Sequence, residues 1–279
     1  MSAAVRCRPR FWQRTVLLLA AMAAGSIAAA TAPPEPSKRP VQQQRTPVIS
    51  IIIDDLGYRL DTGEQATRLP GPVACAILPR SPHAGVLARL AHQHGKEVIL
   101  HLPMQSEDYG RLDPGGLTLH MTRREFLHTL AQDLADVPYV SGVNNHMGSL
   151  LTQHPGDMAW LMRALARRGL FFVDSRTTRR TVAEQVALET GLPTTRRNVF
   201  LDDSRDPDAI RAQFFRLLVL ARRDGSAVAI GHPYPHTMAV LQRELPQLQL
   251  YGVRLVPVRR LIALQQAGRR TWQASVAQH

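Results

Sequence analysis

The chain has 279 residues, of which 44% are hydrophobic, 5% aromatic and 20% charged, and its formal net charge at pH 7 is +12. This apolar content excludes disorder over most of the length, and a total of two cysteines, Cys7 and Cys75, excludes a small disulfide-stapled fold. One stretch alone, at the N-terminus, approaches the length of a membrane span, so a polytopic membrane protein is excluded as well.

Residues 1–32 have the pattern of an export signal. Four arginines precede an uncharged, Leu- and Ala-rich run from Thr15 to Ala32, and the small residues Ala28–Ala30 fit a cleavage site. An uncleaved N-terminal anchor is the alternative. Both alternatives predict an exported protein, either periplasmic or anchored in the inner membrane and facing the periplasm.

The excess of positive charge persists after the signal, at about +8 without its four arginines. The basic residues that follow the signal are scattered along the chain in pairs such as Arg123-Arg124. This distribution indicates solvated helix faces and not one anion site. An exported protein rarely meets nucleic acid, so we exclude that partner and expect a cell-envelope polysaccharide, peptidoglycan or a similar glycan. Membrane contact is expected only through an uncleaved N-terminal segment.

Residues 33–47 are rich in Pro and Gln and predict a semi-extended linker. From Val48 to Ile262, short apolar runs alternate with segments of helical period, and residues 263–279 are assigned to a C-terminal tail. The predicted strands are Val48–Ile53, Val73–Leu78, Glu97–Leu100, Tyr139–Val143, Leu170–Val173, Asn198–Leu201, Ala227–Ile230 and Leu255–Val258. The predicted helices are Ala84–Gln93, Thr122–Ala135, Asp157–Arg168, Val182–Thr190, Asp206–Arg222 and Pro235–Leu245.

This alternation of about eight strands with six or seven helices predicts one α/β domain, a (β/α) barrel or a distorted one. Its seven or eight strands are expected to be mostly parallel, because each crossover connection is right-handed. In such folds the chemistry gathers at the carboxyl ends of the strands.

Polar residues follow six of the predicted strands: Asp54-Asp55, His101, Asn144-Asn145-His146, Asp174, Asp202-Asp203 and His232. Taken singly, each aspartate has an alternative role as a helix cap or turn residue, and each histidine as a hydrogen-bonded structural residue. Taken together, they place carboxylates and imidazoles on one predicted rim. Two histidines and a carboxylate are a suitable ligand set for Zn²⁺ or a similar divalent ion.

The runs IIIDDLG, LHLPMQ, GVNNHMGS, VDSRT and AIGHPYPHT occur in this order. Together they resemble the divergent polysaccharide deacetylase family, an outlying branch of the NodB-type carbohydrate esterases, over nearly all of the region from Val48 to Ile262. The resemblance implies a NodB-like distorted barrel and makes Asp54 a general base and Asp55 a metal ligand. His101 matches the first histidine of the second NodB motif, and His232 matches the general-acid histidine.

Three departures from the NodB pattern are visible. One residue, Leu56, is inserted before the glycine of the first motif, and Gln105 stands where the second motif has its second histidine. No arginine matches the third motif, which Asn144–Gly148 replaces. We hypothesise that His146 supplies the missing imidazole. Asp174 falls near the acidic position of the fourth motif.

The residue types also support deacetylation on chemical grounds. A divalent ion, zinc in our prediction, held by Asp55, His101 and His146 would activate water and polarise an acetyl carbonyl. Asp54 would accept the proton of the water, and His232 would protonate the departing amine.

Further residues are assigned supporting roles. Asp174 or Asp203 is expected to orient His232, and Asp203 also to contact the substrate. Asn144 and Asn145 are expected to donate hydrogen bonds to the oxyanion or to sugar hydroxyls.

The predicted reaction is removal of N-acetyl or O-acetyl groups from a cell-envelope polysaccharide, with Tyr58 and Tyr234 as a small stacking platform. Three alternatives remain open. The first is a binding or scaffold protein of the envelope that keeps the fold without turnover. The second is a metal-dependent hydrolase of another bond. The third is a metal-free glycosidase that uses Asp54 with Asp174 or Asp203.

Overall fold

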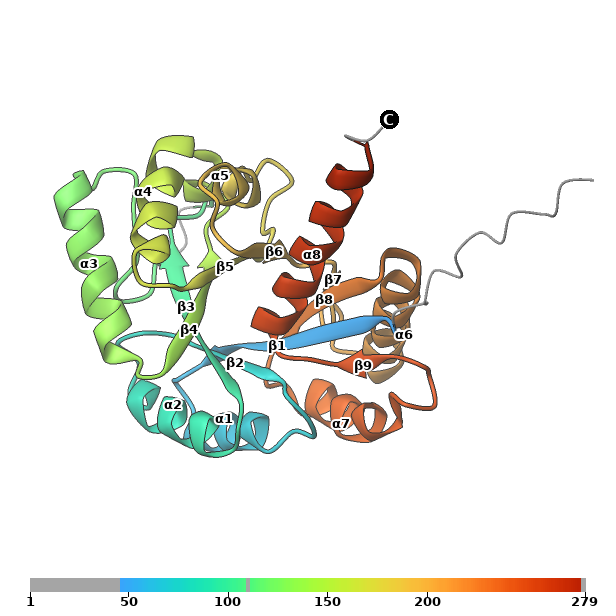
Figure 1. Ribbon diagram of the computed structural model, residues 1–279. Helices are drawn as coiled ribbons and strands as arrows, with labels where there is room; N and C mark the ends of the chain where they lie inside the picture. Colours follow the sequence, from blue (N-terminus) through green and yellow to red (C-terminus); the bar gives the residue numbers. More distant parts are fainter. Residues whose placement is uncertain (1–45, 109–110, 277–279) are drawn as a thin grey trace, which may run out of the picture. The chain divides into compact units, whose positions relative to one another are not determined.

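Nine parallel strands organise the part of the chain that this computed structural model describes, residues 46–108 and 111–276 (Figure 1). Eight of them lie in the order β6-β5-β4-β3-β2-β1-β8-β7, and β9 pairs with β1. The strands are β1 Val48–Leu56, β2 Ala74–Ile77, β3 Glu97–Met104, β4 Val140–Met147, β5 Phe171–Asp174, β6 Thr194–Arg196, β7 Val199–Phe200, β8 Ser226–Gly231 and β9 Arg254–Leu255.

Helices join most successive strands, as parallel pairing requires, while β6 and β7, which do not pair with each other, are joined by Arg197-Asn198. They are α1 Leu60–Thr67, α2 Ala84–Gln93, α3 Arg123–Asp136, α4 Pro155–Ala166, α5 Ala183–Glu189, α6 Pro207–Asp224, α7 Pro235–Glu244 and α8 Val258–Val276, with 3₁₀ turns at Leu151–Gln153 and Leu245–Gln247. The arrangement is a NodB-like half-barrel of parallel strands, which confirms the predicted fold class.

Most element predictions agree with the structure to within a few residues, and the Thr122–Glu125 capping box of α3 is present. The sequence analysis did not locate α1, β6 or α8. Helix α1 is short, with eight residues, and contains Gly63, where a Cβ atom would lie 2.5 Å from a methyl group of Leu87. The interior of α1 thus needs a helix-disfavouring residue, because helix α2 packs closely against it.

The apolar side chains lie on both faces of the sheet. Ile51 and Ile53 of β1 belong to the larger core, under the surrounding helices. Ile52 points to the opposite face and joins a second cluster with Phe171 and Val228. Because alternate residues of β1 are buried on opposite faces, its sequence is a continuous β-branched run.

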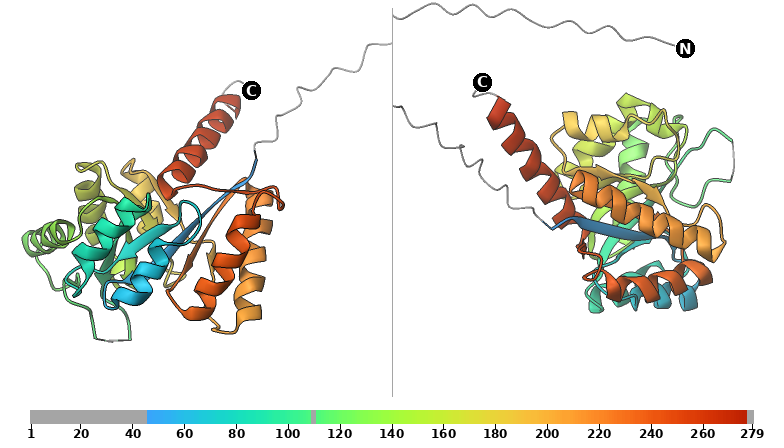
Figure 2. Two further views of the ribbon diagram at one scale, coloured as in Figure 1. Left: turned by 90° about the horizontal axis from the view of Figure 1, so that it is seen from below. Right: turned by 90° about the vertical axis from the view of Figure 1, so that its right-hand side faces the viewer.

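Helix α8 closes this second cluster. Its first turns contribute Val258, Leu261 and Ile262, all almost fully buried. The helix then continues to Val276, through most of the residues assigned to a C-terminal tail, and its far half projects from the domain (Figures 1 and 2). The buried first turns explain why helical structure begins inside the predicted domain.

The predicted export signal lies outside the described residues, as does most of the predicted linker. Within the described ranges, none of the helices combines the length and apolarity that crossing a membrane requires.

Candidate active site

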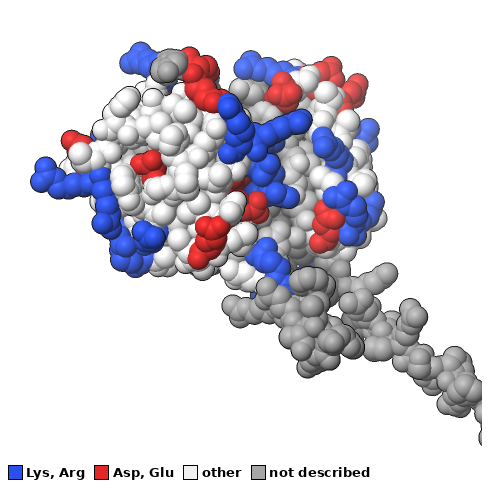
Figure 3. All heavy atoms as spheres, turned by 90° about the horizontal axis from the view of Figure 1, so that it is seen from above, with Lys and Arg blue, Asp and Glu red and all other residues white. Residues whose placement is uncertain are grey.

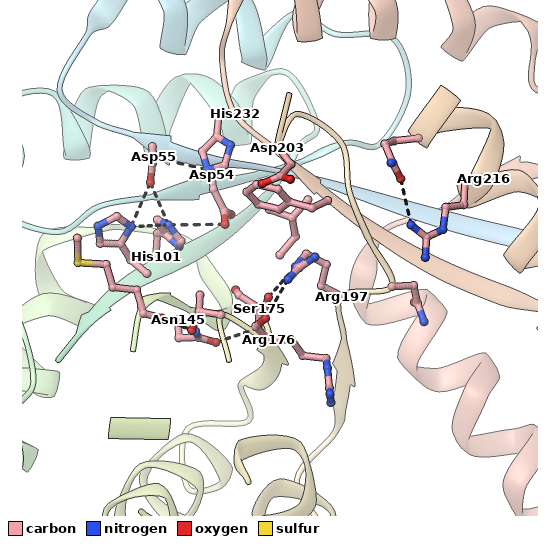
Figure 4. A pocket seen from close by; sticks show the side chains of 17 residues that line it. Asp54, Asp55, His101, Asn145, Ser175, Arg176, Arg197, Asp203, Arg216 and His232 are labelled. Carbon is pink, nitrogen blue, oxygen red and sulfur yellow. Dashed lines mark hydrogen bonds and ion pairs between the residues drawn. The ribbon is translucent and has the colours of Figure 1, made fainter. Parts of the chain in front are cut away.

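A cavity of about 640 Å³ lies where strands β1, β3, β4 and β8 end. Its lining includes Asp54, Asp55, His101, His146 and His232, so the sequence-predicted acids and imidazoles do converge at one rim (Figure 4). The register of the sheet explains this convergence. Parallel pairing aligns His101 with Asn144 and places His146 opposite Pro103, two residues further on.

Three ligand-type atoms form a tight triangle in this cavity. Asp55 Oδ1 lies 3.2 Å from His101 Nε2 and 3.1 Å from His146 Nδ1, and the two imidazole nitrogens are 3.1 Å apart. Around an ion with bonds of about 2.1 Å, neighbouring ligand atoms lie about 3.0 to 3.4 Å apart. The triangle of Asp55, His101 and His146 therefore has the dimensions of a divalent-metal site.

In each imidazole the ring proton lies on the nitrogen that points away from the triangle. The nitrogen that faces the triangle therefore carries a free lone pair. Nδ1 of His101 lies 2.9 Å from Oδ1 of Asn144, which only accepts, so the ring proton belongs on Nδ1 and Nε2 is free. Nε2 of His146 lies 3.0 Å from Oδ2 of Asp113, so the proton belongs on Nε2 and Nδ1 is free. Two nitrogen lone pairs and a carboxylate oxygen then face one point, an arrangement that a cation stabilises.

Electrostatics favours a positive charge at the same point. Burial opposes a charge on His101, but Asp54 and Asp55 raise its pKa to about 9. Burial likewise disfavours the charged form of Asp55, but its close contacts with His101 and His146 hold the pKa of this carboxyl well below its usual range. A proton or a metal ion at this point offsets the negative charge of Asp54 and Asp55. A metal ion has to displace the proton in order to bind.

A second carboxylate fixes the outer side of His146. Asp113, in the loop between β3 and α3, accepts from His146 through Oδ2 and from the hydroxyl of Tyr58 through Oδ1, at 2.7 Å. Such carboxylate–histidine pairs orient metal ligands in many proteins. The sequence analysis missed Asp113, because it lies in an aperiodic loop and no strand end marks it.

The end of β1 departs from regular strand geometry. Asp55 has φ +58°, and the pairing register of β1 with β2 shifts between Ile53 and Leu56. This irregularity places the consecutive Asp54 and Asp55 in one cavity, whereas strand alternation would separate them. Gly57 follows with φ +135°, where a Cβ atom would lie 2.0 Å from Oγ of Ser81. A non-glycine residue with positive φ stores strain, which is common at functional sites.

Asp54 is almost fully buried beside the triangle. Its Oδ1 accepts a 2.9 Å hydrogen bond from Asn144, and its Oδ2 lies 3.6 Å from His101 Nε2. Burial raises the pKa of Asp54 above its usual value, against the attraction of His101. A carboxyl whose pKa is raised is a better proton acceptor than an ordinary aspartate.

His232 enters the cavity from the end of β8 and is held by Asp202. Nδ1 of His232 lies 2.9 Å from Oδ1 of Asp202, while Oδ2 accepts from the backbone N–H of His232 and from the hydroxyl of Thr237. Burial opposes the charged form, yet the hydrogen bond to Asp202 raises the pKa of His232. Nε2 of His232 points into the cavity, 3.6 Å from Asp55 Oδ2.

The expected orienting role of Asp174 is corrected by this geometry. The buried Asp174 accepts hydrogen bonds from the backbone N–H of Arg176 and Glu184 and from the hydroxyl of Thr181, and it fixes the loop before α5. Asp203, the other candidate, is exposed and lines the cavity, which is compatible with substrate contact.

The substrate-binding prediction for the two asparagines is also corrected. Asn144 is fully buried and its amide is committed to Asp54, Ser175 and His101. Asn145 lines the cavity, but its amide bonds the carbonyl of Met147 and the backbone N–H of Ser175. Both side chains hold the site together and have few donors left for a ligand.

Gln105, at the position of the missing second histidine, lies away from the triangle. Its side-chain oxygen accepts from the backbone N–H of Leu119 and holds the loop between β3 and α3. Residues Tyr58 and Tyr234 line a second, adjoining cavity of about 440 Å³ that also reaches Asp55 and His232. Both tyrosines thus lie beside the triangle, and the ring of Tyr234 packs against His232 and the guanidinium of Arg205.

Fold and site together define a NodB-like barrel with a candidate Asp/His/His metal centre. A model of the divergent polysaccharide deacetylase family matches residues 51–262. The chain belongs to the divergent polysaccharide deacetylase family.

Two curated relatives are similar over most of the domain. The uncharacterized protein YibQ of Escherichia coli K12 is 43% identical over 195 residues, 70% of this chain and 61% of that protein. An uncharacterized protein of Haemophilus influenzae is 39% identical over 209 residues, 74% of this chain and 75% of that protein. The match thus spans less than two thirds of the length of the first relative.

Among solved structures, an uncharacterized protein of Agrobacterium tumefaciens C58 superposes with a TM-score of 0.75 at 22% identity. The superposition covers 80% of this chain and 92% of that protein. This likeness supports the fold.

Proposed function

We propose that this protein is a metal-dependent hydrolase that removes acetyl groups from a cell-envelope polysaccharide. The observation that carries the proposal is the triangle of Asp55, His101 and His146, whose edges of 3.1 to 3.2 Å suit a divalent ion. Oxygen and imidazole ligands suit zinc, which is the metal we propose. Family membership supports the acetylated glycan as substrate.

A bound zinc ion supplies a Lewis acid for the acetyl carbonyl and acidifies a water molecule. The residues around it provide the proton transfers. Asp54, buried and with a raised pKa, is placed to accept the proton of the attacking water. Asn144 donates to Asp54 and keeps the carboxylate turned toward the cavity.

His232 is placed to protonate the departing amine or hydroxyl. Asp202 holds Nδ1 and stabilises the imidazolium, so the proton on Nε2 faces the cavity. Tyr58 and Tyr234 are proposed to stack against a sugar ring beside His232.

We also propose that the protein acts outside the cytoplasm, periplasmic or anchored at the inner membrane. The charged and Ala-rich pattern of residues 1–32 supports this location. Peptidoglycan or a similar glycan is the proposed partner.

The deciding experiment combines elemental analysis with an assay of acetate release from acetylated chitooligosaccharides and peptidoglycan. We expect near-stoichiometric zinc or another divalent ion in the purified protein, and acetate release that a chelator abolishes and added metal restores. Bound metal without acetate release from any glycan would favour an envelope-binding protein that keeps the fold. Protein that never binds a divalent ion would contradict the proposal.

A further inference from the structure

One side of the 640 Å³ cavity carries arginines that the proposed chemistry does not use. Arg176 follows β5, Arg197 lies between β6 and β7, and Arg216 lies on α6. These segments are separate in sequence, but Figure 4 shows all three side chains to one side of the acids and imidazoles, with Arg176 near Arg197 and Arg216 further away. Figure 3 shows that Lys and Arg side chains gather near the middle of one molecular face.

These three arginines lack carboxylate partners. Within residues 46–108 and 111–276, none of them has an acidic oxygen at ion-pair distance. Other arginines nearby do: Arg180 pairs with Glu107 and Arg196 pairs with Glu184. Unpaired arginines at a cavity, among paired neighbours, indicate charge kept available for a ligand.

The environment of Arg197 sharpens this point. Its Nε and Nη2 donate to the carbonyl oxygens of Ser175 and Arg176, at 2.6 and 2.9 Å, and its guanidinium lies 4.9 Å from the centre of the Phe200 ring. Two of its five N–H groups are thus used, and the half-buried guanidinium feels Asp54, Asp174 and Asp203 without forming an ion pair with a described carboxylate. Burial accordingly lowers the pKa of Arg197.

Arg176 and Arg216 flank this anchored guanidinium. Arg176 has φ +51°, a strained conformation that the carbonyl contact from Arg197 and a hydrogen bond to Asp174 maintain. Arg216 and Gln213 lie one turn apart on α6 and both line the cavity. Asp203 is the acidic residue of the lining on this side, and it is exposed.

We propose that Arg176, Arg197 and Arg216 form an oxyanion subsite, which selects glycans bearing a carboxylate or phosphate on the acetylated sugar or its neighbour. The inference rests on the proposed function and deepens it by naming the substrate class. Guanidinium groups bind both anions through paired N–H donors, and both are compatible with the arrangement. A cavity of this volume accommodates a ligand of small-oligosaccharide size.

The test is calorimetric titration of the purified full-length protein, with and without added zinc, using three N-acetylated disaccharides that are neutral, carboxylated or phosphorylated. We expect the wild type to bind an acidic disaccharide about tenfold more tightly than the neutral one, and the preference to shrink as salt increases. Comparing the affinity for the carboxylated disaccharide with that for the phosphorylated one identifies which anion the subsite binds. Equal affinity for all three, or binding of none, overturns the inference.

Variants test whether the preference for acidic disaccharides depends on the three arginines. Arg176→Gln and Arg216→Gln are expected to remove most of it, whereas Arg223→Gln keeps it, because Arg223 pairs with Asp224 at the far end of α6. Arg197→Gln is a weaker test, since it removes bonds to two carbonyl oxygens and can disturb folding. An equal loss of preference in Arg223→Gln overturns the assignment.

Acetate release distinguishes this inference from the proposed function. Hydrolysis of the neutral disaccharide without any preference for acidic ones refutes the oxyanion subsite alone. Selective binding of acidic disaccharides without hydrolysis refutes the deacetylase proposal alone.

Discussion

The two sides of the cavity are built in opposite ways. On the side of β1, β3, β4 and β8, nearly every polar atom has a partner within the protein, as for Asp54 with Asn144 and His232 with Asp202. On the side of β5, β6 and α6, the guanidinium groups of Arg176 and Arg216 carry no ion pair with described residues.

Under the proposed function, this difference separates reaction chemistry from substrate selection. Reacting groups gain from a network that holds them before substrate arrives, because reorganisation then costs little during the reaction. Groups that select a substrate gain from unused donors, because an internal partner would compete with the ligand. The comparison therefore predicts that substitutions on the first side alter metal content and rate, and that substitutions on the second alter substrate preference.

The largest effect is expected from the triangle itself. Asp55→Ala, His101→Ala and His146→Ala should each lose most of the bound metal, and acetate release should fall about a thousandfold or more. Elemental analysis beside the activity assay measures both. Arg216→Gln is the matched control and should keep wild-type metal content. Full metal retention in all three alanine variants would refute the ligand assignment.

Asp54 lies on the same side of the cavity as the metal ligands, but Asp54→Asn should lower the rate of acetate release without lowering the metal content. The amide keeps the hydrogen bond with Asn144 but accepts a proton poorly, so activity should fall about 10² to 10⁴-fold with metal retained. Because burial raises the pKa of Asp54, the acidic limb of the wild-type pH profile should lie above the ordinary aspartate value. Unchanged turnover in this variant would remove Asp54 from the mechanism.

Asp202→Asn is expected to reduce activity about tenfold or more and to shift its pH dependence. In the proposed mechanism His232 acts in its protonated form, so activity should be lost as pH rises through its pKa. Asp202 raises that pKa, and its removal should move the alkaline limb to lower pH. Asp174→Asn serves as control, because Asp174 bonds the loop before α5 and should leave the limb in place. Equal shifts in both variants would contradict this assignment.

The smallest effects concern the outer partners of His146. Asp113→Asn should weaken metal affinity about tenfold, as loss of such partners generally does, and Tyr58→Phe by a smaller factor. Competition with a chelator measures both affinities. Wild-type affinity in Asp113→Asn would show that the loop between β3 and α3 does not support the metal centre.

Much of the site could be predicted because parallel sheets put strand ends together. Asp55 and His146 lie near the ends of β1 and β4, and His101 lies in the second half of β3, so the topology brings them to the same edge of the sheet. The choice of Asp202 over Asp203 or Asp174 could not be predicted. It depends on the pairing of β7 with β8, which places one carboxylate against the imidazole and leaves its neighbour in solvent.

The arginine side illustrates the same limit. Its residues lie on three elements between Arg176 and Arg216, and the sequence shows them only as members of a scattered basic population. The half-burial of Arg197, and the lack of an ion pair between these three guanidinium groups and any described carboxylate, appear only after folding. The sequence analysis expected solvated helix faces for the basic residues and did not single out these three.

The sequence by itself determined the parallel α/β barrel, because runs of β-branched residues and helical periods are local properties of the chain. It also determined which residue types end the strands. Only the tertiary structure decided which polar atoms meet, since hydrogen bonds such as Asp113 with His146 join residues far apart in sequence. Partner choice depends on distances of a few ångströms, which strand register and loop conformation set together.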